Sequence, residues 1–211
     1  FLPSMVGWFG LVELARLKAG ETVLVTAANK CWGPYVVQMA KALGGQVIAA
    51  IDDAEDRDFV RELGADHIIV TEEQDLVTRI NKLTDNRGVN IVMDALGGPT
   101  MCLLGDALAP CGRLVLYGLQ GGNETPFPAC AAFQKNIQFF VHCIGNFTGK
   151  KELGIEQDKA AVAKALQGIN QLTADGLLKP LIDKSFAFNK VGAAHQYMST
   201  CPSRGRVVLN V

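Results

Sequence analysis

The stretch that decides the fold runs from Glu21 to Asp53 and has the sequence ETVLVTAANKCWGPYVVQMAKALGGQVIAAIDD. It opens with a short apolar run, VLV, of the kind found in a parallel strand that is covered on both faces. After the polar turn AANKCWG, apolar residues recur at helical spacing until the chain reaches Gly44-Gly45. A second apolar run then ends in two carboxylates. This order of strand, helix and strand predicts one βαβ unit.

The turn between the first strand and the helix is the first candidate binding site. Unpaired N–H groups at a helix N-terminus, together with the helix dipole, favour a phosphate group. Asp52 and Asp53 follow the second strand, where a carboxylate can accept hydrogen bonds from a ribose. We therefore predict that a bound dinucleotide crosses the turn and places its ribose near Asp52 or Asp53. The predicted contacts within the turn are Asn29, Lys30, Cys31, Trp32 and Gly33.

The alternation of strand and helix continues along the chain. Apolar runs predict strands near 21–27, 46–51, 67–70, 89–94, 112–117 and 137–143, and segments of helical periodicity separate most of them. Such alternation predicts an α/β fold: a doubly wound parallel sheet (Rossmann fold) flanked by helices, with right-handed crossovers. In the strand order 3-2-1-4-5-6, the run at 137–143 lies at an edge of the sheet.

Composition narrows the class of protein. The 211 residues are 49% apolar and 19% charged, with a formal net charge of −1, so the chain can bury a sizeable core. Charges of both signs are interspersed, which argues against nucleic acid as a partner. No apolar run reaches the roughly 18 to 20 residues that a membrane span needs, and no signal peptide is visible. We expect no membrane partner and a cytoplasmic location.

The chain resembles the cofactor-binding half of the medium-chain dehydrogenase/reductase superfamily, in its zinc-free quinone oxidoreductase and enoyl reductase branch. Counterparts of that branch occur in the right order over nearly the whole chain. They are LVELARLKAGETVLV (11–25), ELGADHIIV (62–70), RGVNIVMDALGG (87–98), GRLVLYG (112–118), GLLKPLIDKSF (176–186), AAHQYM (193–198) and GRVVLNV (205–211).

The resemblance implies a nicotinamide cofactor, NAD or NADP, and hydride transfer to a small-molecule quinone, enone or enoyl thioester without zinc. In the resembled proteins the stretch matching Ala95, Leu96 and Gly97 lies along the cofactor. The turn matching Tyr117 and Gly118 approaches the nicotinamide end. Glycines at such places are also common in ordinary tight turns, so both interpretations stay open for Gly97.

The turn departs from the pattern of this branch, which usually ends in Gly-Gly-Val-Gly. Lys30, Cys31, Trp32 and Gly33 stand at those positions, and only the last glycine is kept. On one interpretation Lys30 supplies a compensating positive charge. On the other, the chain is a degenerate dinucleotide-binding or scaffold domain without catalysis. A third possibility, a Rossmann-like methyltransferase, is disfavoured by the segments after residue 111.

Local charge and family resemblance disagree on the form of the cofactor. Four acids and one cation in Asp52 to Arg57 favour NAD, because a 2′-phosphate needs a cation and is repelled by carboxylates. The resembled branch mostly uses NADPH. The sequence leaves this choice open.

The resemblance also divides the chain. Residues 1–183 match a Rossmann-type dinucleotide-binding domain with a lead-in helix, and residues 184–211 match a segment that rejoins a GroES-like catalytic domain in relatives. That domain has no counterpart in this sequence, so we expect little turnover from the chain alone. The strands in 185–188 and 206–211 must then pair with each other, dock on the core or join another chain, since apolar edge strands promote association.

The remaining reactive residues suggest no catalytic group. The six cysteines, Cys31, Cys102, Cys111, Cys130, Cys143 and Cys201, lack the close spacing of a zinc cluster. Several of them lie in apolar surroundings and are interpreted as small buried hydrophobes of a reducing compartment. The three histidines are interpreted as structural, no metal site is expected, and the catalytic residue stays unknown. Finally, the apolar run at 137–144 predicts a homodimer formed through this edge strand.

Overall fold

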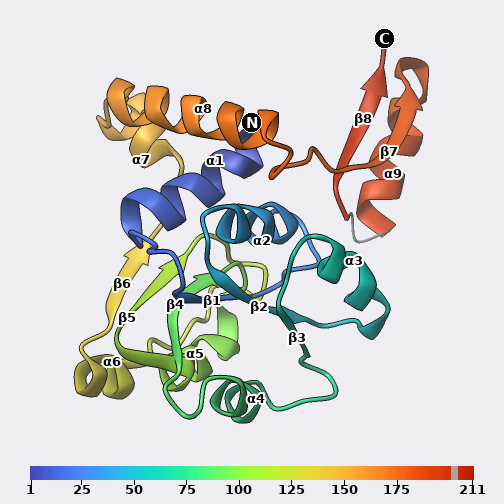
Figure 1. Ribbon diagram of the computed structural model, residues 1–211. Coiled ribbons are helices and arrows are strands. Elements are labelled where there is room, and N and C mark those ends of the chain that lie inside the picture. The colour runs from blue at the N-terminus through green and yellow to red at the C-terminus, as the bar shows by residue number, and fades with distance from the viewer. Residues whose placement is uncertain (201–203) are drawn as a thin grey trace.

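The computed structural model describes residues 1–200 and 204–211. Its centre is a six-stranded sheet, all parallel, with the order β3-β2-β1-β4-β5-β6 (Figure 1). The predicted doubly wound fold and strand order are confirmed. The strands are β1 (Thr22–Val25), β2 (Gln46–Ile51), β3 (His67–Val70), β4 (Val89–Asp94), β5 (Leu108–Leu116) and β6 (Gln138–Val141).

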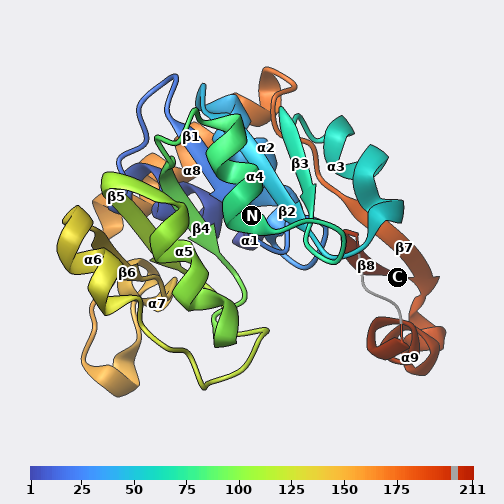
Figure 2. The same cartoon turned by 90° about the horizontal axis from the view of Figure 1, so that it is seen from below.

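Helices cover both faces of this sheet (Figures 1 and 2). On one face lie α1 (Leu2–Trp8), the π-helix η1 (Phe9–Leu14), α2 (Gly33–Ala42), α3 (Arg57–Glu62) and α8 (Lys159–Ala174); on the other lie α4 (Leu76–Leu83) and α5 (Met101–Ala107). Each face has its own hydrophobic cluster, because successive residues of a strand point to opposite faces. Val25 and Met93 pack on the α2 side, whereas Leu24 and Val92 pack on the α4 side.

Shorter elements complete the connections of the main sheet. They are η2 (Ala54–Asp56), η3 (Gly98–Thr100), α6 (Ala129–Lys135), α7 (Gly145–Thr148) and η4 (Lys151–Leu153). Asp53 caps η2 and Asp75 caps α4, each through a carboxylate that accepts a backbone N–H.

Three of the six strands differ from their predicted ranges. β1 ends at Val25, two residues early, because the side chain of Thr26 already turns to a partner on β4. β5 begins at Leu108, four residues early, and its pairing with β4 contains a register shift near Cys111, which has a φ of 59°. β6 is shorter than 137–143 at both ends.

The last part of the chain forms a separate small sheet. β7 (Ile182–Ala187) and β8 (Arg206–Asn210) pair in parallel, and η5 (Phe188–Lys190) and α9 (Val191–Thr200) lie between them in sequence. In Figure 1 this unit stands to one side of the main sheet. The two C-terminal strands thus pair with each other, one of the three outcomes that the sequence allowed. The proposed division between residues 183 and 184 falls inside β7 and stays a prediction.

The cysteines correct one interpretation. Cys31, Cys102, Cys111, Cys130 and Cys143 are free and exposed, so the view of them as buried hydrophobes is wrong. Cys201 lies outside the described residues. Among the three histidines, His142 is buried, and its Nε2 lies 3.1 Å from the carbonyl oxygen of Val6, whereas His67 and His195 are exposed.

Candidate functional site

The carboxyl ends of β1, β2, β4 and β5 meet at one edge of the sheet, where the predicted residues gather. The strand order reverses between β1 and β4, and a crevice opens at such a point in doubly wound sheets. Two cavities lie there, and each is lined in part by the loop from Asn29 to Gly33, one by Lys30 and the other by Cys31 and Trp32. We call them the β2-side cavity and the β5-side cavity.

The β2-side cavity has a volume of about 270 Å³ and is largely apolar. Its polar residues come from the tips of β1, β2 and β3, from the loop, from η3 and from the segment after β5: Thr26, Lys30, Asp52, Thr71, Thr100 and Gln120. Its apolar walls come from Ala27, Ala50, Ile51, Leu76, Leu96 and Leu104. The size and lining suit a flat apolar ring joined to a polar sugar.

A hydrogen-bonded network holds the carboxylate of this cavity in place. Asn29 Nδ2 donates to Asp52 Oδ1 at 3.0 Å and to Asp56 Oδ2 at 2.7 Å, and Lys30 forms an ion pair with the other oxygen of Asp52. Arg204 pairs with the buried Asp56 at 2.5 Å. Partial burial of Asp52 opposes ionisation, but the hydrogen bonds from Lys30 and Asn29 outweigh it and lower its pKa. Asp52 is therefore ionised at neutral pH.

Asp53 has a different role from its neighbour. Its side chain accepts the N–H of Glu55 at 2.9 Å and caps η2, and Asp53 does not line the β2-side cavity. Of the two carboxylates that the sequence left open, Asp52 alone faces this cavity.

The loop itself has the geometry of an anion site in its backbone. Gly33 begins α2, and a Cβ added there would lie 2.1 Å from the carbonyl oxygen of Ala27, so only glycine fits. Within residues 1–200 and 204–211, the N–H groups of Cys31 and Trp32 donate no hydrogen bond. Cys31 itself has a φ of 50°, a conformation uncommon for a residue with a side chain.

The β5-side cavity is lined by the next residues of this loop and by the segments that follow β4 and β5. Its volume is about 250 Å³, and its lining residues are Cys31, Trp32, Ala95, Tyr117, Gly118 and Gln120. Gln120 lines both cavities, so the loop and Gln120 together mark the boundary between them.

A buried carboxylate organises the turn between the two cavities. Asp94, fully buried at the end of β4, accepts the Thr26 hydroxyl at 2.5 Å and the N–H groups of Leu96 and Gly97 at 3.1 and 2.9 Å. Burial raises the pKa of Asp94, and these hydrogen bonds offset only part of that effect. Asp94 is not among the predicted cofactor contacts, and its part in holding this turn was not predicted. The feature of the sequence that could have indicated this role is a carboxylate at the end of an apolar strand.

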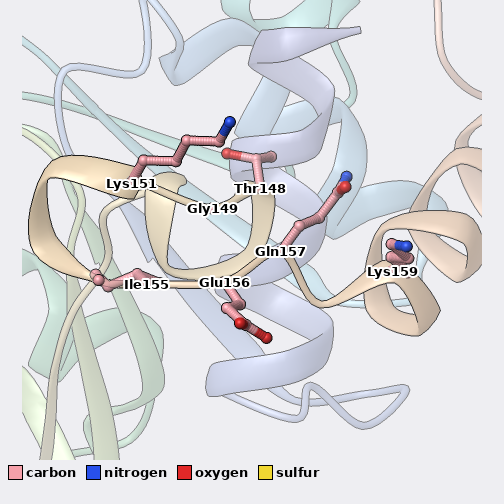
Figure 3. Close-up of a pocket in the computed structure, with 8 residues that line it drawn as sticks. Thr148, Gly149, Lys151, Ile155, Glu156, Gln157 and Lys159 are labelled. Carbon is pink, nitrogen blue, oxygen red and sulfur yellow. The ribbon is translucent and has the colours of Figure 1, made fainter.

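Other hollows of the described chain are lined by none of the predicted site residues. One, of about 670 Å³, lies between α7 and α8, and the side chains of Lys151 and Glu156 point away from each other there (Figure 3).

The part of the chain that the structure describes contains no group of three or more His, Cys, Asp and Glu residues able to hold a metal ion. Nor does it contain a helix long and apolar enough to cross a membrane.

Comparison with known proteins identifies the family. Residues 33–166, more than half of the chain, match the family described as zinc-binding dehydrogenase. The chain belongs to this family. It covers the cofactor-binding part of the medium-chain dehydrogenase/reductase superfamily, in the branch of quinone oxidoreductase-like proteins and enoyl reductases.

The relatives of this chain are longer proteins. Quinone oxidoreductase-like protein 2 of Rattus norvegicus is 31% identical over 198 residues, which are 93% of this chain and 55% of that protein. The mycocerosic acid synthase-like polyketide synthase of Mycobacterium tuberculosis is 26% identical over 99% of this chain and only 10% of its own length. The chain thus spans about half of one kind of relative and a small part of the other.

Solved structures agree on the fold. The CurK enoyl reductase superposes with a TM-score of 0.81 at 26% identity, covering 99% of this chain and 60% of that one. Escherichia coli quinone oxidoreductase, solved in complex with NADPH, gives a TM-score of 0.83 at 24% identity over 100% of this chain and 63% of that one. At that identity the second likeness supports the fold alone.

Proposed function

We propose that the chain is the nucleotide-binding domain of a zinc-independent oxidoreductase that uses NAD(H) or NADP(H). The observation that carries this proposal is the pair of cavities that share the Asn29–Gly33 loop and Gln120, at the point where the strand order reverses. The β2-side cavity takes the adenosine, the free N–H groups of Cys31 and Trp32 take the pyrophosphate, and the β5-side cavity takes the nicotinamide riboside. Ala95, Leu96, Gly97 and Gly118 lie along this path.

When bound, the nicotinamide ring supplies the hydride. The contribution of this chain is to bind and orient the ring. We propose a quinone, an enone or an enoyl thioester as the acceptor, on the strength of the family branch and of relatives named as quinone oxidoreductase-like proteins and as an enoyl reductase.

We further propose that NAD is preferred to NADP. An ionised Asp52 suits two ribose hydroxyls, whereas a 2′-phosphate would meet the carboxylates of Asp52 and Asp56. Lys30 and Arg204, the two cations nearby, are already paired with these carboxylates. When Asp52 accepts ribose hydroxyls instead of the Lys30 ammonium, Lys30 becomes available to bind a phosphate. This role of Lys30 stays a prediction.

Isothermal titration of the chain with NADH, NADPH and S-adenosylmethionine tests these proposals together. We expect NADH to bind more tightly than NADPH, and S-adenosylmethionine not to bind. Tighter binding of NADPH than of NADH would overturn the proposed preference for NAD, but not the proposed binding of a dinucleotide. Binding of neither dinucleotide would instead favour the degenerate scaffold, for which the bulky Lys30-Cys31-Trp32 turn is the argument.

We also propose a homodimer through residues 137–144. β6 is an edge strand of the described six-stranded sheet, and Phe139 and Val141 on it are 36% and 62% exposed. Pairing with a two-fold mate would cover these side chains and satisfy the open edge.

A further inference from the structure

The hydroxyl of Tyr117 is a buried polar group without a partner. Tyr117 is 8% exposed, and its oxygen has neither solvent contact nor a hydrogen bond among the described residues. Burying a hydroxyl without a partner destabilises a protein, and most buried hydroxyls are therefore bonded. An unbonded one at the edge of a binding crevice calls for a functional explanation.

Neighbouring groups do not supply the missing partner. Asp94 is the nearest carboxylate along the strand tips, and the backbone N–H of Tyr117 donates to its carbonyl oxygen at 2.8 Å. The carboxylate oxygens of Asp94, however, accept from Thr26, Leu96 and Gly97. Tyr117 is instead one of the residues that line the β5-side cavity, together with Cys31 and Trp32.

The protonation state of this phenol is fixed. Burial raises the pKa of Tyr117, and the nearby acidic groups Asp94 and Cys31 raise it further. The hydroxyl keeps its proton throughout the neutral range, so it is available as a hydrogen-bond donor.

We propose that Tyr117 is a positioning residue whose hydroxyl donates a hydrogen bond to the nicotinamide riboside half of the bound dinucleotide. This inference rests on the proposed function, which places that half in the β5-side cavity. Ribose oxygens and the carboxamide oxygen of nicotinamide are acceptors of the kind that the hydroxyl lacks. The adenosine half lies beyond the Asn29–Gly33 loop and makes no contact with Tyr117.

The test compares Tyr117→Phe with the unchanged chain by isothermal titration with NADH, ADP-ribose and ADP. We expect NADH affinity to fall about three- to tenfold, the usual effect of losing one neutral hydrogen bond, while ADP affinity stays the same. A loss shared by ADP-ribose assigns the bond to the ribose, and a loss confined to NADH assigns it to the carboxamide. Either result supports the proposal.

A thermal melt of the free chain separates positioning from structure. Because the hydroxyl is unbonded in the free protein, Tyr117→Phe should melt at the same temperature as the unchanged chain or higher. The matched control is Tyr35→Phe, since Tyr35 donates to the carbonyl of Leu181 at 3.0 Å, outside the cavities. That variant should melt lower and keep the ratio of NADH to ADP affinity.

Three outcomes would overturn the inference. Unchanged NADH affinity in Tyr117→Phe would remove the contact, an equal loss for NADH and ADP would indicate a shifted loop, and a lower melting temperature would reveal an internal partner. If the unchanged chain bound none of the three nucleotides, the proposed function would fail, and this inference with it.

Discussion

At the scale of single residues, the site depends on a few positions that admit little variation. Gly33 is one, because the space that a Cβ would need is filled by the backbone of Ala27 and Ala28. The constraint comes from the turn itself as much as from a phosphate. Gly33→Asp would place a negative charge beside the predicted pyrophosphate site, but it would also disrupt the turn. A loss of nucleotide affinity in this variant could therefore not be assigned to charge repulsion alone.

Gly33→Ala should lower the free energy of unfolding by about 1–3 kcal/mol, the usual cost of overpacking. Chemical denaturation measures this. Gly192→Ala is a matched control, since a Cβ at Gly192, within α9, meets nothing within 4 Å and alanine favours a helix. Equal stability of Gly33→Ala and the unchanged chain would show that the loop can rearrange.

Asp52→Asn should weaken NADH binding about tenfold, since hydrogen bonds to a charged group contribute more than neutral ones. The affinity for NADPH should fall less, so the difference in affinity between NADH and NADPH should become smaller. Asp53→Asn is the control, because asparagine also caps a helix and Asp53 lies outside the cavity. Titration of both variants with both nucleotides gives the answer; a larger loss of NADPH than of NADH would contradict it.

The same carboxylate predicts a pH dependence. The folded pKa of Asp52 is below its unfolded value of about 3.9. Its ion pair therefore contributes stability that is present above the unfolded pKa and is lost as the pH falls through the folded pKa. Between pH 6 and pH 2, the melting temperature of Asp52→Asn should therefore fall less than that of the unchanged chain.

At the scale of the elements, the sequence predicted the core well. The ranges of β2, β3 and β4 match the predicted strands residue for residue, because buried parallel strands are apolar throughout and bounded by turns. The ends of β1, β5 and β6 were less accurate. There, side-chain bonds such as that of Thr26 to Asp94, and the register shift in β5, depend on neighbours that are distant in sequence.

The site was predictable to a similar degree. Position along a βαβ unit was enough to bring the loop and Asp52 together, and they do line neighbouring cavities. The network was not predictable, since Asp56 and Arg204 are far apart in sequence and Asn29 had no visible reason to bridge two carboxylates. Nor did the sequence indicate that Lys30 pairs with Asp52 in the free chain.

Val141→Lys on β6 should convert the proposed dimer into a monomer, because a charge on the exposed edge opposes strand pairing. Val141 is 62% exposed, so the substitution should leave folding intact. Met198→Lys, on the exposed side of α9, is the control and should stay dimeric. Light scattering at tens of micromolar measures the mass of each variant. If the unchanged chain is already a monomer at this concentration, the proposed dimer through β6 is wrong.

At the scale of the whole molecule, the small C-terminal sheet is tied to the main domain close to the β2-side cavity. Arg204 pairs with Asp56 and lies over the ring of Phe59, with 5.7 Å between its Cζ and the ring centroid. Tyr35 and Gln38 on α2 bond to the backbone at Leu181 and Lys179. The C-terminal unit and the ribose carboxylates therefore share one set of contacts.

Arg204→Ala should lower stability by about 1 kcal/mol or more, because it leaves the buried carboxylate of Asp56 with fewer partners. NADH affinity should fall as well, since Asn29 links Asp56 to Asp52. Arg206→Ala, at the start of β8, is the comparison, and it should leave NADH affinity unchanged. Loss of stability without any change in affinity would show that the two ends of the network act independently.

The pairing of β7 with β8 has a consequence for the way in which the molecule opens. A sheet of two strands is marginally stable by itself, and this one has exposed side chains on most of its length. Its amide protons should therefore exchange with solvent through partial opening, at a free energy well below that needed to unfold the six-stranded sheet. Because Arg204 belongs to this unit, each such opening would also release Asp56, so adenosine binding should slow exchange in a part of the chain that the nucleotide never touches.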